Sequence, residues 1–157
     1  MDKKYKTGLM LGIVLVAVIA LFDIISMNSG MFGTTDQYTN GVFGGDWWSL
    51  FLKLNLAIIV AFGAGYYFFY KKDLSETIGV IATPVILWFF GLSDVLFFWF
   101  QGKVVPSVLP WLNDSLIIGT VTSLLGFTTV TSLTLFVSII LGFAVSYGVA
   151  KLLWKVN

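Results

Sequence analysis

Three charged side chains lie inside long apolar stretches of the sequence: Asp23, Lys53 and Asp94. Counted along a helix from the lysine-bearing ends of these stretches, at about 1.5 Å per residue, they lie roughly 24, 27 and 32 Å deep. Two carboxylates and one ammonium at matched depth predict a ligand, ion or proton site, or a structural ion pair between Lys53 and Asp94 with Asp23 as a second acceptor. The alternative is that each side chain snorkels to the nearby interface separately.

A second set of polar residues follows the third apolar stretch. Asp73 and Glu76 have the spacing of a helix-capping box, with Asp73 as the cap. Glu76, Thr83, Asp94 and Gln101 are separated by seven, eleven and seven residues, which places them within about 20° of one direction on a continuous helix. This stripe predicts either a polar track or the side of the helix that faces the bundle.

The last apolar stretch carries small residues at every fourth position: Thr134, Ser138, Gly142, Ser146 and Ala150. Such a seam allows two helix backbones to approach closely. We interpret it as a helix-packing seam whose partner lies either in this chain or in another subunit. Gly8 and Gly12 form a shorter pattern of the same kind in the first stretch.

The composition excludes several classes of chemistry. The chain has no cysteine and no histidine, which removes disulfides, thiolate nucleophiles and the commonest metal ligand and general base. We therefore expect no metal site and no cofactor. A net charge of +1 offers no electrostatic basis for binding nucleic acid. Asp23 and Asp94 have the matched depth that an aspartate pair of the kind used by intramembrane hydrolases needs. No sequence motif of such enzymes flanks either residue.

The elements that position these groups are predicted to be membrane helices. Hydrophobic residues make up 58% of the chain, charged residues 11%, and the mean hydropathy is +0.94, whereas soluble domains carry about 25% charged residues. The apolar stretches predict spans at about 7–27, 47–70, 74–101 and 131–154, with a kink at Pro84. The apolar run over 115–154 would be about 60 Å long as one helix, twice the hydrocarbon thickness. We therefore expect a break near 126–130, preceded by a short interfacial or re-entrant helix at about 115–125.

The fold class that follows is an all-α integral membrane protein, a four-transmembrane-helix bundle forming a single domain over 1–157. With four spans, seven lysines share one side: Lys3, Lys4, Lys6, Lys71, Lys72, Lys151 and Lys155. The opposite loops hold Asp36, Asp46, Asp114 and one lysine, Lys103. The positive-inside rule then predicts a multi-pass protein of the cell membrane with cytoplasmic N- and C-termini.

The missing catalytic side chains, the small soluble loops and the abundant aromatic and small residues favour a non-catalytic subunit. Its expected partners are the lipid bilayer and either other membrane subunits of a larger complex or further copies of the chain. The alternative is a small carrier, channel or lipophilic-ligand-binding protein that uses Asp23, Lys53 and Asp94. An intramembrane aspartyl hydrolase is the least favoured hypothesis.

Overall fold

The computed structural model describes residues 3–28 and 45–155, and every regular element in these ranges is helical. The elements are α1 (Lys3–Asn28), α3 (Gly45–Tyr66) with its π-helical continuation η1 (Tyr67–Lys71), α4 (Leu74–Phe89), α5 (Leu92–Phe100), the 3₁₀ turn η2 (Pro110–Leu112), α6 (Leu116–Leu124) and α7 (Ser132–Lys155). The loop expected between the first two spans, with Asp36, lies outside the described residues.

Three described helices are long and apolar enough to cross a membrane by themselves. Their apolar segments are Lys6–Ser26, Leu52–Tyr70 and Ser132–Leu153. The pair α4 and α5 passes the same criteria together, so the described chain holds up to four candidate spans. These helices fit an all-α, multi-pass membrane protein.

Helix α4 occupies the centre of the bundle and contacts α1, α3, α5 and α7. The closest approach of α1 to α4 uses the small residues of the first span. A Cβ atom on Gly12 would lie 2.6 Å from Thr83 Cγ2, and one on Gly8 would lie 3.7 Å from the carbonyl carbon of Gly79. The two glycines therefore form the crossing point of α1 and α4, where side chains would hold the backbones apart.

The third apolar stretch is not one continuous helix over 74–101. Helix α4 runs through Pro84 and ends at Phe89, and α5 leaves it at an angle of 73°. Gly91 forms the turn with a φ of 92°, a left-handed conformation that glycine adopts without strain. A side chain there would also collide with Leu135 and Ile118. The sharp bend of this stretch therefore lies at Gly91, beyond Pro84, where we expected a kink.

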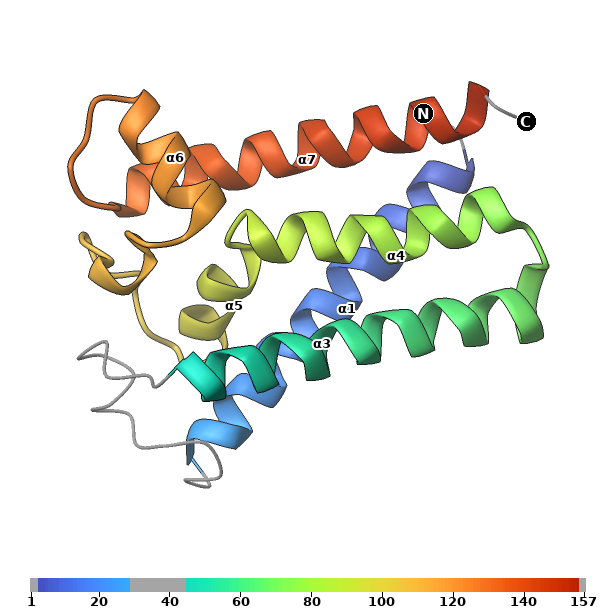
Figure 1. Cartoon of the computed structure of the whole chain (residues 1–157), viewed down its shortest axis with the longest axis horizontal. Coiled ribbons are helices and arrows are strands. Elements are labelled where there is room, and N and C mark those ends of the chain that lie inside the picture. The colour runs from blue at the N-terminus through green and yellow to red at the C-terminus, as the bar shows by residue number, and fades with distance from the viewer. Residues whose placement is uncertain (1–2, 29–44, 156–157) are drawn as a thin grey trace.

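One end of the bundle holds the start of α1, the turn between η1 and α4 and the end of α7; we call it the termini end, and the opposite end the far end (Figure 1). At the far end α5 and α6 lie crosswise to the long helices (Figure 1).

The expected helix at 115–125 corresponds to α6, and the break that follows it ends where α7 begins. There Thr131 and Thr134 each accept a hydrogen bond from the backbone N–H of the other, at 2.9 and 3.2 Å. This reciprocal cap satisfies backbone donors that the break frees.

Candidate functional site

Asp23 and Asp94, which are 71 positions apart in the sequence, are neighbours in the fold. Asp23 lies in the last two turns of α1 and Asp94 in the first turn of α5, and α1 packs along α5. Asp23 is 9% exposed and its Oδ1 has no hydrogen-bond partner among the described residues, whereas Asp94 is half-buried. We call these two residues the aspartate pair.

Lys53 does not join the aspartate pair. Its side chain is exposed on α3, and among the side chains that the structure describes no ion pair links it to Asp23 or Asp94. The reason is the bend at Gly91, which turns α5 away from the course of α4 and toward α1. The matched depth of the three residues was counted along a straight third helix, which the bend at Gly91 interrupts. The assignment of all three residues to one functional cluster stays a prediction.

Helix α5 holds Asp94 where a negative charge is favourable. The helix begins at Leu92 after its N-cap Gly91, which supplies no side-chain hydrogen bond. The first turn of a helix has unpaired N–H groups and the positive end of the macrodipole, and both attract a carboxylate. The bend at Gly91 therefore creates a helix start inside the apolar region and places Asp94 at it.

One polar residue near this layer was missed by the sequence reasoning. Asn55 on α3 is fully buried, and neither its amide nitrogen nor its amide oxygen has a hydrogen-bond partner among the described residues. It lies one turn toward the far end from Ile59, a member of the same buried core as Ile19 and Ala20 of α1. Asp23 lies one turn beyond those two along α1. The signal was present in the sequence as an amide within an apolar stretch.

Glu76 is a buried carboxylate near the termini end. Asp73 caps α4 as predicted, because its side chain accepts a hydrogen bond from the Glu76 backbone N–H at 3.1 Å. The Glu76 side chain is 4% exposed and its Oε1 accepts a hydrogen bond from the Tyr66 hydroxyl at 2.7 Å. Glu76 thus ties α4 to α3.

The polar stripe expected along the third span is divided by the bend. Glu76 and Thr83 are buried on α4, but Asp94 lies on α5 and Gln101 just beyond its end. The stripe is therefore no continuous track, because a helical angle holds only while the helix is unbroken.

The small-residue seam of α7 packs inside the chain. Gly142 lies against Phe90, at the end of α4, and Thr134 accepts a hydrogen bond from Thr122 of α6 at 3.0 Å. Ser138 and Ser146 are buried, with hydroxyls that have no hydrogen-bond partner among the described residues, and Ala150 is half-buried. The seam thus allows α7 to approach α4 and α6 closely.

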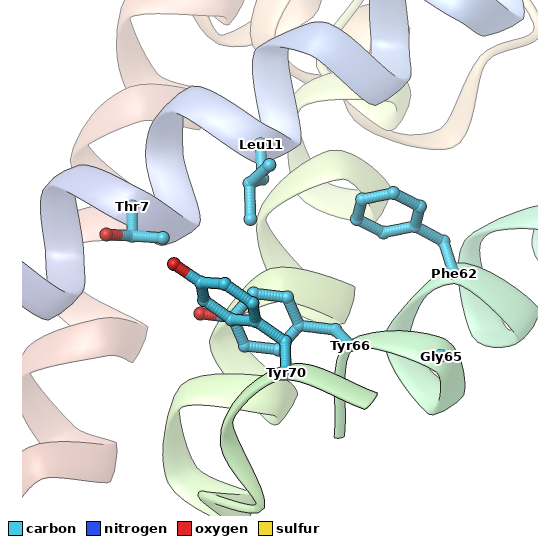
Figure 2. A pocket seen from close by; sticks show the side chains of 6 residues that line it. All are labelled: Thr7, Leu11, Phe62, Gly65, Tyr66 and Tyr70. Carbon is cyan, nitrogen blue, oxygen red and sulfur yellow. The ribbon is translucent and has the colours of Figure 1, made fainter. Parts of the chain in front are cut away.

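A cavity of about 440 Å³ lies near the termini end, between α1 and the end of α3. Its lining comprises Thr7, Leu11, Phe62, Gly65, Tyr66 and Tyr70. Figure 2 shows the hydroxyl ends of both tyrosines pointing toward α1 beside Thr7, with Leu11 and Phe62 at the other side of the space. The cavity is thus at the opposite end of the bundle from the aspartate pair.

The described residues contain no group of three or more Asp, Glu, His or Cys side chains that would suit a metal ion. The aspartate pair can instead hold a proton, or a single cation with further oxygen ligands from the backbone or solvent. Comparison of the chain with family models, curated proteins and solved structures finds no match.

Proposed function

We propose that this multi-pass membrane protein is a small carrier that binds a cation, the proton included, at the aspartate pair. The observation that carries the proposal is the buried Oδ1 of Asp23, which has no hydrogen-bond partner among the described residues and lies on the helix that packs along the helix of Asp94. Lys53, the one lysine that the sequence places at this depth, is exposed and forms no ion pair with the carboxylates.

The electrostatic cost of the pair supports this function. One charged side chain at the centre of a membrane helix costs about 2.5–3.5 kcal/mol on insertion scales, and near the interface the cost is smaller. Two adjacent carboxylates add mutual repulsion to this cost. A bound cation or proton relieves both terms, so the unoccupied pair attracts positive charge. The break between α4 and α5 resembles the discontinuous helices of transporters, in which unwound carbonyls and helix C-terminal ends coordinate Na⁺.

Cation-dependent thermal stabilisation of the purified protein tests the binding step. A ligand that binds the folded state raises its stability by RT ln(1 + [L]/Kd), about 2.7 kcal/mol at one hundred times Kd. We expect one of Na⁺, K⁺ or H⁺ to stabilise the wild-type protein and Asp114→Asn, a control at an exposed far-end aspartate. Asp94→Asn and Asp23→Asn should lose this response. Equal stabilisation of the wild type by choline, or an unchanged response in Asp94→Asn, contradicts a cation site.

Transport of the cation is tested separately in proteoliposomes. The stabilising cation should cross the membrane faster in vesicles with the wild-type protein or Asp114→Asn than in vesicles with Asp94→Asn. Binding without flux would assign the site to a ligand-binding protein and contradict the carrier.

A non-catalytic subunit of a larger membrane complex is the second candidate. It is favoured by α3, whose apolar segment is the least buried of the three long candidate spans, at 22% against 33% and 39%. Lys53, Ala57 and Ala61 are exposed at every fourth position of this helix, which combines a charge with small residues on one face. Other subunits or further copies of the chain would cover this face. Stoichiometric partners in a mild-detergent pull-down from native membranes, lost in Lys53→Glu, would support this candidate.

An intramembrane aspartyl hydrolase remains the least favoured proposal. The aspartate pair supplies the adjacency that this chemistry needs, and hydrolysis further requires a water molecule and a peptide segment between the carboxyls. Cleavage of a helical reporter by the wild type, abolished in both Asp23→Asn and Asp94→Asn, would establish it.

We also propose that the protein lies in the cell membrane with both termini in the cytoplasm. Three exposed lysines belong to the termini end: Lys6 near the start of α1, Lys72 in the turn between η1 and α4, and Lys151 near the end of α7. The exposed Lys103 follows α5 at the far end. This asymmetry supports the orientation by the positive-inside rule.

A further inference from the structure

The cavity between α1 and α3 has a polar end and an apolar end. Thr7 and Tyr70 lie nearest the ends of their helical segments, next to the termini end of the bundle. Leu11 is one turn deeper on α1, and Phe62 is two turns deeper on α3 than Tyr70. Polarity therefore falls from the membrane surface inward, in the same direction as it falls along a phospholipid.

The buried carboxylate nearest the cavity is covered. Tyr66 lines the cavity, and its hydroxyl donates to Glu76 Oε1 at 2.7 Å. Its ring is packed against the ring of Tyr70, with centroids 5.2 Å apart. The 4% exposure of Glu76 means that a molecule in the cavity meets tyrosine surfaces and hydroxyls.

Two lysines lie next to residues of the polar end in the sequence. Lys6 directly precedes Thr7 and Lys72 follows Tyr70 by two positions, and both are exposed. Lysines close to the membrane surface each contribute about 1 kcal/mol of attraction to anionic lipid. The charge of this end therefore complements a phosphate-bearing headgroup with a net negative charge.

We propose that the cavity holds one anionic phospholipid, with its phosphate near Thr7 and Tyr70 and an acyl chain against Leu11 and Phe62. A volume of about 440 Å³ lies within the range of about 300–1,000 Å³ typical of ligand pockets and accommodates part of one lipid molecule. The site is distant from the aspartate pair and does not depend on the function proposed for it.

Gly65 provides a substitution at the cavity wall whose Cβ meets no steric obstacle. It lines the cavity, and a Cβ atom built on it has no heavy atom within 4 Å. Gly148 on α7 has equally open space and is not among the cavity-lining residues. Gly65→Leu and Gly148→Leu are thus a matched pair that differ in whether the substituted residue lines the cavity.

The test is native mass spectrometry of the delipidated protein titrated with phosphatidylglycerol or phosphatidylcholine of identical chains. We expect the wild type and Gly148→Leu to bind one phosphatidylglycerol at least about tenfold more tightly than phosphatidylcholine, and Gly65→Leu to lose this site. Unchanged phosphatidylglycerol binding in Gly65→Leu, or equal affinity of the wild type for the two lipids, overturns the proposal.

A second variant keeps the test independent of packing. Lys6→Gln combined with Lys72→Gln changes two exposed side chains and should leave the lipid-free thermal stability unchanged. The preference for phosphatidylglycerol over phosphatidylcholine should fall by at least about tenfold, since two lysines each contribute about 1 kcal/mol. An undiminished preference in this double variant refutes the role of the flanking charges and overturns the proposal.

Discussion

The contact between α7 and α4 at Gly142 allows a sharp prediction about packing. A Cβ atom on Gly142 would lie 2.7 Å from Phe90 Cβ and 2.9 Å from Phe90 Cγ. Carbon atoms in favourable contact are about 3.5–4.0 Å apart, so the shortfall is roughly 1 Å. The Phe90 ring can rotate, but its Cβ is bonded to the backbone and cannot move away alone. Gly142→Leu therefore requires the two helices to separate.

Helix separation has a calculable consequence. A radial gap of about 0.5–1 Å forfeits a quarter to a half of the dispersion energy of each contact across it. Overpacking of this kind typically costs about 1–3 kcal/mol. Gly148→Leu is the matched control, because it lies on the same helix with no heavy atom within 4 Å of the built Cβ. Any change in helix propensity from glycine to leucine is shared by the two variants and cancels between them.

The assay is unfolding by sodium dodecyl sulfate in mixed micelles, with the oligomeric state measured in parallel. We expect Gly142→Leu to be less stable than Gly148→Leu by about 1–3 kcal/mol. Adding Phe90→Ala, which removes the ring and leaves the Cβ, should recover part of this difference. Equal stabilities for the two leucine variants, with an unchanged oligomeric state, would refute the reasoning that this seam packs against α4.

Three further predictions follow from the described contacts. A cysteine at Asp114 should react with an impermeant thiol reagent added outside intact cells, and one at Lys72 should not; the reverse pattern would refute the proposed orientation. Tyr66→Phe should lower the free energy of unfolding by about 1–3 kcal/mol, because a buried carboxylate of α4 loses its hydrogen bond; an unchanged unfolding curve would contradict this. Lys53→Met and Asp94→Asn should have additive effects within about 0.5 kcal/mol, since no ion pair joins them; a larger coupling energy in the double-mutant cycle would restore the pair.

The sequence by itself determined the class of the protein and the position of most helices. The apolar stretches are long and nearly free of charge, and in a membrane a backbone satisfies its hydrogen bonds within a helix whatever its neighbours are. Helix α6 was predictable for the same reason, because an apolar run over 115–154 exceeds the membrane thickness as one helix. Local chemistry also sufficed at Asp73, whose capping role depends on residues within one turn.

Only the tertiary structure decided which polar groups meet. The bend at Gly91 packs against Leu135 and Ile118, residues far along the chain that no local pattern connects to it. That bend turns Asp94 toward α1, which carries Asp23, and away from the course of α4. Depth counted along straight helices cannot predict such a turn. A helix fixes the height of its side chains by a constant rise per residue, whereas the direction in which they face another helix depends on crossings and breaks that arise from packing.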